Sequence, residues 1–375
     1  MAFHYFFLTL QGKKKYLTFV TLNTRQPYKT DISVLMLFHA RPDHFRKVWE
    51  QVCIARPARL FLYQDGPRMT AADGSSVSDV EKSRDWHGIM ECRRLVDDSN
   101  IDWQCEVHRL YQERNYGCDP SGFMSQRWAF SQTDKCMVLE DDVVPSQSFF
   151  PFCKEMLDRY ENDERITMVA GFNTSIPSSQ GPFPKGDSYF FTRAFSIWGW
   201  ASWARVVNNW DGDYGFVKDP QLFGKLKDKV TQYGQRRDMP QLCLKHAAEG
   251  KPYFETVFWS YMLLHDGLAI MPAVNQINNI GLEGGTHYST QLQLIPRRLR
   301  WQFVMPRYEL DFPLKHPEEV KENPEYQRQY YLMNAWNNPC RKVQYSMEEL
   351  WLNLRQGNFG NILKAVGNRI RKTFS

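Results

Sequence analysis

Three consecutive acidic residues, Glu140, Asp141 and Asp142, follow directly on the apolar run 136–139. Carboxylates this close repel one another and raise one another's pKa unless a positive charge lies among them. A divalent cation is such a charge, because Mg²⁺ and Mn²⁺ prefer carboxylate oxygen, and it would neutralise a diphosphate as its bond to a transferred group breaks. The triplet therefore predicts a site for Mn²⁺ or Mg²⁺. The alternative is a solvated turn whose acids stabilise the N-terminus of the next helix.

The elements that must position these acids alternate between strand and helix. Apolar runs bounded by turn residues predict strands at 32–38, 59–63, 105–110, 136–139 and 166–170. Helical spacing predicts helices at 42–55, 78–98, up to Phe130, and 146–160. This order predicts an α/β fold, in which a mostly parallel, Rossmann-like sheet is flanked by helices on both faces. Beyond residue 172 we expect an irregular half, with a helix at 240–265 and a strand at 269–272.

Polar residues fall where the predicted strands end. Arg41 follows the first strand, Asp65 the second, and Asn115 with Gly117 the third, while the acidic triplet follows the fourth. Ligands of such sheets bind beyond the carboxyl ends of the strands, so these residues form the predicted site. The alternatives are a salt bridge at a helix end for Arg41 and a turn position for Asp65.

The composition excludes several classes of protein. The 375 residues carry a net charge of +5 spread along the chain, without the concentrated basic stripe of a nucleic-acid binder. The 8 cysteines show no CxxC spacing, so we expect reduced thiols in a cytoplasmic protein and no zinc site. No stretch approaches the ~20 apolar residues that span a bilayer, and the order of charges near the N-terminus is not that of a secretory signal.

The chain is expected to contain one catalytic domain between two extensions. Residues 1–30 form an N-terminal extension, 31–172 a nucleotide-sugar half and 173–290 an acceptor half. The C-terminal extension, 291–375, carries apolar residues near helical spacing from Leu350 to Ile370, with basic residues among them. A basic amphipathic helix predicts peripheral contact with the inner face of a membrane, and a terminal helix packed on the core is the alternative.

The triplet and its surroundings resemble a known family. Leu139 and the three acids, followed by Val-Val-Pro at 143–145 and the aromatic pair 149–150, resemble GT-A glycosyltransferases of the N-acetylglucosaminyltransferase I type. The match is closer to bacterial, hemolytic-protein-like members encoded at surface-polysaccharide loci, and it extends over 32–287. It implies that Asp142 binds Mn²⁺ directly, with Glu140 and Asp141 supporting the metal and the donor.

The resemblance also assigns nucleotide contacts. It implies an arginine near the nucleotide at Arg41 and a reader of the uracil edge at Asp65. The family's histidine before an Arg-Trp pair is missing, since Ser125 and Gln126 stand there, so Asn115 or the Gly117 backbone would replace its contact.

Further residues are carried over to the sugar side of the site. Gly199 and Trp200 resemble a segment beside the donor sugar and acceptor, although a tryptophan-rich core turn is an equal alternative. The glycine-rich loop from Asn278 to His287 resembles a flexible loop that closes over the diphosphate, with His287 touching phosphate or metal. An inverting transferase needs a carboxylate base, and Glu255 fills this position, with Asp266, Asp211 and Asp213 as alternatives.

The leading hypothesis is a metal-dependent glycosyltransferase, which moves a sugar from a nucleotide-diphosphate donor, UDP-linked, to a hydroxyl of a glycan or lipid-linked acceptor. A sugar nucleotidyltransferase is one alternative, although its glycine-rich basic loop would follow the first strand, where His-Ala-Arg-Pro stands at 39–42. A carbohydrate-binding protein with a decayed transferase site is another. Neither GxxxxGK[ST] nor GxGxxG follows a predicted strand, which argues against a P-loop or dinucleotide enzyme.

Overall fold

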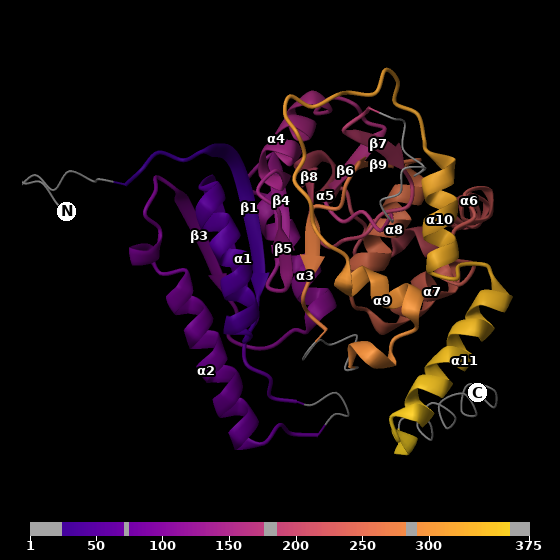
Figure 1. The fold of residues 1–375 in the computed structure, drawn as a ribbon, viewed down its shortest axis with the longest axis horizontal. Helices are drawn as coiled ribbons and strands as arrows, with labels where there is room; N and C mark the ends of the chain where they lie inside the picture. The colour runs from indigo at the N-terminus through magenta and orange to yellow at the C-terminus, as the bar shows by residue number, and fades with distance from the viewer. Residues whose placement is uncertain (1–24, 71–74, 176–185, 283–290, 361–375) are drawn as a thin grey trace, which may run out of the picture.

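A computed structural model of the chain describes residues 25–70, 75–175, 186–282 and 291–360 (Figure 1). Within these residues eight strands form one sheet, in the order β3-β2-β1-β4-β8-β6-β9-β7, and β10 pairs with β5 in a separate two-stranded ribbon. The strands are β1 Thr30–Phe38, β2 Pro57–Gln64, β3 Glu106–Tyr111, β4 Lys135–Glu140, β5 Val143–Pro145, β6 Ile166–Ala170, β7 Tyr189–Thr192, β8 Trp200–Trp203, β9 Leu268–Pro272 and β10 Ile277–Asn279.

The sheet is mostly parallel, as the sequence predicts. Strands β3, β2, β1 and β4 are parallel neighbours, and β6 is parallel to β9. Strand β8 runs antiparallel to both β4 and β6, and β7 runs antiparallel to β9. The half expected to be irregular therefore supplies three strands of the same sheet, because β7, β8 and β9 all come from beyond residue 172.

Helices cover both faces of this sheet. They are α1 Pro42–Ala55, α2 Asp79–Leu95, α3 Cys118–Phe130, α4 Phe149–Arg159, α5 Ala204–Val207, α6 Pro220–Gln232, α7 Met239–Glu249, α8 Phe254–Leu264, α9 Arg297–Val304, α10 Pro324–Met333 and α11 Pro339–Arg355. Three short 3₁₀ helices are described as well, η1 Asp98–Asn100, η2 Gly215–Val217 and η3 Leu292–Leu294. The predicted helix at 240–265 is wrong as a single element, because Gly250 ends α7 at φ 63° and Pro252 follows before α8 begins.

Two tryptophans of β8 show which helices lie on which face. The ring of Trp200 packs against Phe130 of α3 and Phe258 of α8, with centroids 6.4 and 5.3 Å apart. The indole N–H of Trp203 donates to the carbonyl of Leu157 in α4, at 3.0 Å. Residues three apart in a strand point to opposite faces, so α3 and α8 cover one face and α4 covers the other.

Local sequence signals explain where the first helices begin. Pro42 opens α1, and the positions that give the run its helical spacing, Phe45, Val48 and Val52, are fully buried. Helix α2 begins at a capping box, in which the hydroxyl of Ser78 accepts from the Glu81 N–H and the Glu81 carboxylate accepts from the Ser78 N–H. Pro42 and the capping box therefore mark where the first two helices begin after β1 and β2.

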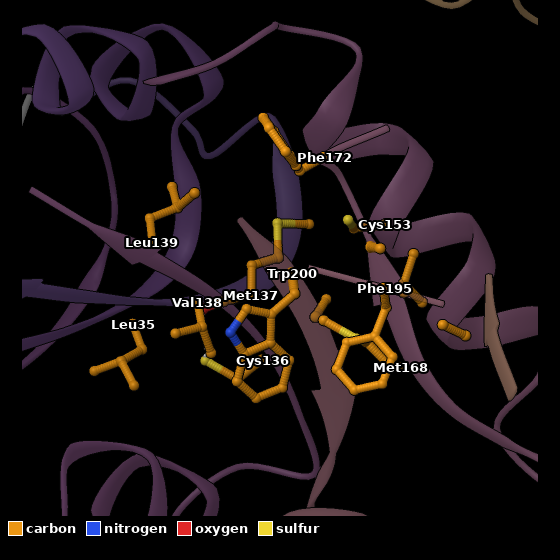
Figure 2. Packing of buried hydrophobic residues seen from close by; sticks show 14 of the residues in the cluster. Leu35, Cys136, Met137, Val138, Leu139, Cys153, Met168, Phe172, Phe195 and Trp200 are labelled. Atoms are coloured by element: carbon orange, nitrogen blue, oxygen red, sulfur yellow. Dashed lines mark hydrogen bonds between the residues drawn. The ribbon is translucent and has the colours of Figure 1, made fainter. Parts of the chain in front are cut away.

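The centre of the core lies between β4, β8 and β6. Figure 2 shows Trp200 among buried residues such as Cys136, Val138 and Met168, and Val138 is its cross-strand partner. The predicted role of Trp200 in stacking on a ligand is therefore wrong, because a fully buried side chain in the sheet core offers no face to a sugar. The alternative, a tryptophan packed in the core, holds for this residue.

The C-terminal region shares this core. Residues of α10 reach it directly, since Tyr326 is almost fully buried and the Tyr330 hydroxyl donates to the carbonyl of Phe195 at 2.9 Å. The N–H of Asn323 donates to the carbonyl of Phe191 in the edge strand β7, at 2.8 Å. Residues 314–336 thus cover one end of the sheet, whereas α11 lies at the periphery of the molecule (Figure 1).

Two chain-wide features can be checked directly. The eight cysteines, all within the described ranges, are unpaired. Of the helices that the structure describes, none combines the length and the apolar character that crossing a bilayer requires.

We predict that Trp200→Ala lowers the free energy of unfolding by ~3–5 kcal/mol, because it leaves a large cavity beneath α3 and α8. The matched control is Trp86→Ala on α2, where the side chain is 50% exposed and the expected loss is below about 1 kcal/mol. Urea unfolding followed by circular dichroism measures both. Equal losses in the two variants would contradict the placement of Trp200 in the core.

Candidate functional site

The carboxyl ends of β1, β2, β3 and β4 meet at one edge of the sheet, because these strands are parallel neighbours. Side-chain hydrogen bonds connect the loops that follow these strands. The Gln64 amide donates to the carbonyl of His39 at 2.8 Å, and the His39 ring Nε2 lies 2.9 Å from the carbonyl of Gly66. The Asn115 amide donates to the same Gly66 carbonyl at 3.0 Å. The structure thus brings together the residues that the sequence places at strand ends.

Arg41 lies between two of the acids. Its Nη2 donates to the carboxylate of Asp141 and, at 2.8 Å, to Oδ2 of Asp142. A second contact runs from Arg41 Nε to Asp141 Oδ2 at 3.4 Å, and the His39 N–H also donates to this oxygen. Although burial opposes a charged guanidinium, the two carboxylates raise the pKa of Arg41 above its ordinary value. The positive charge that the triplet requires is therefore supplied in part by the chain itself.

Asp142 has one carboxylate oxygen without a partner. Its Oδ1 is buried and accepts no hydrogen bond, while its Oδ2 accepts from Arg41. The backbone carbonyl of Asp142 accepts from the Ile280 N–H at 2.9 Å, and a side chain on Gly281 would collide with the carboxylate. A buried carboxylate oxygen that accepts no hydrogen bond is costly, and a cation would offset that cost.

A flexible loop was expected at 278–287, and the prediction is wrong for residues 278 and 279, which lie in a strand. Ile277–Asn279 forms strand β10, which pairs antiparallel with β5. The side chain of Asn279 accepts from the Gly281 N–H at 2.8 Å, so the backbone is held against Asp142. His287, the residue expected to contact phosphate or metal, lies outside the described residues.

Burial and mutual repulsion perturb the acids. Desolvation, then Asp142 and Asp141, raise the pKa of Glu140 to about 8. Desolvation and the neighbouring Asp141 likewise raise the pKa of Asp142. Asp119, in the first turn of α3, adds a further negative charge near Glu140, and sequence reasoning missed it. Its signal was available, because an acid in the first turn of a helix that follows a strand-end loop lies on the same edge.

The Cys118 thiol stands beside this group of charges and was also missed. Desolvation first, and then the carboxylates led by Glu140, raise its pKa well above the ordinary range. A raised pKa disfavours the thiolate that a nucleophile or a soft metal ligand requires.

Asp65 organises the loop that precedes α3. Its Oδ1 accepts from the N–H groups of Gly66 and Tyr116, at 3.0 and 2.9 Å, and its Oδ2 accepts from Gly117 at 3.0 Å. The side chain is buried, and these three backbone donors occupy most of its lone pairs. These contacts are those of a residue that stabilises a turn, which is the alternative stated for Asp65. The role of Asp65 in binding the edge of a base stays a prediction.

Glycine is required at positions 117 and 199 for different reasons. Gly117 has φ 86°, a conformation that side chains disfavour, and a Cβ there would meet open space. Gly199 has φ 65°, and a Cβ there would collide with Ile277 and crowd Val143. The close approach expected at Gly199 is therefore made to the β5–β10 ribbon of the protein itself, whereas Gly117 opens outward at the start of α3.

One of the two predicted catalytic acids, Asp266, lies far from the triplet. Asp266 precedes β9, which runs in the same direction as β4, so it lies at the opposite edge of the sheet from the carboxyl end of β4. It forms an ion pair with Lys229 at 2.5 Å, and its prediction as a catalytic residue is wrong. Glu255 is exposed in the first turn of α8, on the side of Arg236, and its role stays a prediction.

The fit of this site to a divalent cation rests on few residues. Among the described residues, no group of three or more His, Cys, Asp or Glu side chains is arranged to hold a metal ion. The unpartnered Oδ1 of Asp142 and the raised pKa of Glu140 nevertheless fit a positive charge at this point. A cation would thus be bound by Asp142 and Glu140, with its remaining ligands supplied by substrate oxygens or water.

Comparisons with known proteins give little beyond this geometry. No family model and no curated protein match the chain. One similar solved structure is the inositol-1-phosphate CTP transferase from T. maritima, at 9% identity and TM-score 0.27, covering 48% of this chain and 74% of that one. Another is a UTP-bound UGPase from Acinetobacter baumannii, at 10% identity and TM-score 0.32, covering 66% of this chain and 88% of that one.

We predict that Asp65→Asn loosens the loop at 115–117, because an amide nitrogen replaces one acceptor of the backbone N–H groups. The expected loss of unfolding free energy is ~1.5–3 kcal/mol, the usual range for hydrogen bonds to a charged group. Hydrogen exchange at the Tyr116 and Gly117 amides should accelerate at the same time. Asp228→Asn, an exposed position on α6, serves as the control, and unchanged exchange in Asp65→Asn would contradict the prediction.

A second prediction concerns pH. The folded-state pKa of Glu140, about 8, lies above its ordinary value of 4.5, so the folded protein retains a proton that the unfolded chain releases in this interval. The contribution of Glu140 to stability therefore falls as pH rises from about 4.5 to about 8. Glu140→Gln should match the wild type at the acid end and exceed it above the window by on the order of 2–4 kcal/mol.

Unfolding titrations with chelator present, at pH 5, 7 and 9, measure this difference between Glu140→Gln and the wild type. A gap that stays constant across the three conditions would show that Glu140 titrates normally. Asp228→Asn again provides the control, since its carboxylate is exposed on α6.

Proposed function

We propose that the chain is a metal-dependent transferase that acts on a nucleotide-linked sugar, and that it transfers the sugar to a hydroxyl of a glycan or lipid-linked acceptor. The observation that carries the proposal is the unpartnered, buried Oδ1 of Asp142 beside Arg41 at the carboxyl end of β4. In sheets of this kind, substrates bind at this edge. The combination of acids and one arginine suits a diphosphate bridged by a divalent cation.

Each residue has a distinct part in this proposal. Asp142 and Glu140 would hold Mn²⁺ or Mg²⁺, and the cation would neutralise the charge that develops on the leaving diphosphate. Asp141 orients Arg41 through its paired contacts, and Arg41 keeps a side chain that is 28% exposed, so it remains accessible to a phosphate. Asp65 fixes the turn that presents the backbone around Gly117, near which the nucleotide would lie.

Sugar nucleotidyl transfer is the second candidate. Both solved structures reported above are named for nucleotidyl transfer or for a UTP-bound UGPase, and the same acids would serve a metal-bound triphosphate. What separates the two on this chain is the loop after β1. In residues 39–42, Arg41 is paired to two acids and Pro42 has no N–H, where a triphosphate-binding loop would offer glycines and free backbone N–H groups.

The donor site is tested by calorimetry with a panel of UDP-sugars and UTP, in Mn²⁺ and in chelator. We expect one UDP-sugar to bind only when Mn²⁺ is present, and we expect Asp142→Asn to weaken this binding at least tenfold, because the cation loses its main carboxylate. Asp228→Asn should bind like the wild type. Absence of any metal-dependent nucleotide binding by the wild type would refute the proposal.

The products distinguish the two candidates. Release of UDP from a UDP-sugar in the presence of acceptor glycans indicates glycosyl transfer. Release of pyrophosphate from UTP and a sugar 1-phosphate indicates nucleotidyl transfer instead and would overturn the leading proposal.

A further inference from the structure

Helix α11 presents its apolar side chains to the solvent. Five of them are between 46% and 66% exposed, and they are Val343, Met347, Leu350, Trp351 and Leu354. At about 100° per residue these positions fall within one arc of roughly 100°, so they form a continuous stripe along the helix. We call these five residues the α11 stripe.

The opposite side of α11 faces the protein and is polar. Tyr345 and Asn353 are the buried residues of the helix, and the Tyr345 hydroxyl donates to the carbonyl of Met333 at 2.7 Å. The Glu348 carboxylate accepts from the N–H of Arg297, at 2.9 Å, which ties α11 to the start of α9. The helix is therefore anchored by hydrogen bonds, and its hydrophobic surface is directed away from the core.

Positive charge borders the α11 stripe. Arg341, Lys342 and Arg355 lie on α11 itself, and the guanidinium of Arg355 lies over the Trp351 ring at 5.4 Å. Arg297 and Arg298 are exposed at the start of α9, and Arg298 is close enough to Tyr345 to influence its pKa. The acids of α11 are Glu348, which is tied to α9, and Glu349.

The chain beyond the described residues continues this charge pattern. Residues 361–375 contain four basic residues and no acidic residue. Three of the apolar residues of this segment, Ile362, Val366 and Ile370, recur at a spacing of four. The apolar α11 stripe, with basic residues beside it and in the sequence that follows, is complementary to a surface that is apolar inside and anionic outside.

We propose that the α11 stripe binds the surface of an anionic lipid bilayer. The tryptophan and the aliphatic side chains would enter the boundary between headgroups and acyl chains, and the basic residues would contact lipid phosphates. The combination of charge and apolar side chains on one solvent-facing side favours this occupant over a second copy of the chain, because two such basic surfaces would repel each other. This inference does not depend on the proposed transferase activity.

The stripe also lies toward the edge of the sheet that carries the acids. Helix α11 contacts η3, η3 contacts α9, α9 contacts β10, and β10 pairs with β5 directly after Asp142. A bilayer bound at α11 would therefore lie on the side of the molecule that contains the candidate site.

Vesicle sedimentation with the full chain tests this proposal. The wild type should sediment with vesicles of phosphatidylcholine and phosphatidylglycerol in equal parts, and roughly tenfold less with phosphatidylcholine alone or in high salt. The double variant Met347→Ser/Trp351→Ser should lose binding to the mixed vesicles by about tenfold or more. The matched control is Val80→Ser/Trp86→Ser, which removes two comparably exposed apolar side chains from α2 and should bind like the wild type.

Unfolding curves and light scattering accompany the binding measurement, so that misfolding and self-association are recognised. Equal loss in both double variants, or a wild type that does not sediment with mixed vesicles, would overturn the proposal. So would a wild-type dimer that Met347→Ser/Trp351→Ser converts to a monomer without any vesicle binding, because the occupant would then be a second copy. Removal of residues 361–375 should weaken binding, and a truncated chain that binds more tightly would show that this segment covers the stripe instead.

Discussion

The repulsion among Glu140, Asp141 and Asp142 is the constraint on which the site depends. Three carboxylates at the end of a buried strand are stable only where positive charge is fixed near them. Arg41 supplies part of this charge and bridges two of the acids, which links the start of α1 to the end of β4. The raised pKa of Glu140 shows that the compensation is incomplete. The remaining deficit is what makes a bound cation the natural complement of this edge.

The loops around the acids are built so that this charge arrangement holds its geometry. Asp65 collects three backbone N–H groups, and His39 and Asn115 both use the Gly66 carbonyl. A side chain at Gly66 would collide with the backbone of Arg114, so the turn after β2 lies directly against the loop after β3. The strand ends therefore act as one rigid unit, in which moving any loop would displace Arg41 or the acids.

The sequence predicts the helices and strands well where the apolar spacing and the bordering proline or turn residues indicate the same bounds. Helix α1 has the predicted bounds 42–55 and β6 the predicted bounds 166–170, because a proline or a turn closes each of them. The meeting of Arg41, Asp65, Asn115 and the triplet follows from the parallel sheet, in which successive strand ends share an edge. Sequence patterns do not reveal partners distant in the chain. Trp200 looks like a ligand-stacking residue until β8 is seen inserted between β4 and β6, and Asp266 looks catalytic until its strand direction places it at the far edge.

The prediction for 278–279 failed for the same reason, because a glycine-rich stretch is predicted to be a loop when its partner strand is unknown. Its pairing with β5 places the Ile280 N–H on the carbonyl of Asp142 and brings Gly281 against the carboxylate. Helices α9, α10 and α11 follow later in the chain, and α11 lies at the periphery of the molecule (Figure 1). This part of the chain therefore packs against the carboxylate of Asp142 at Gly281 and also carries the exposed α11 stripe. Because β10, α9, η3 and α11 contact one another in turn, a continuous series of packed elements joins the α11 stripe to the ribbon that holds Gly281 against Asp142.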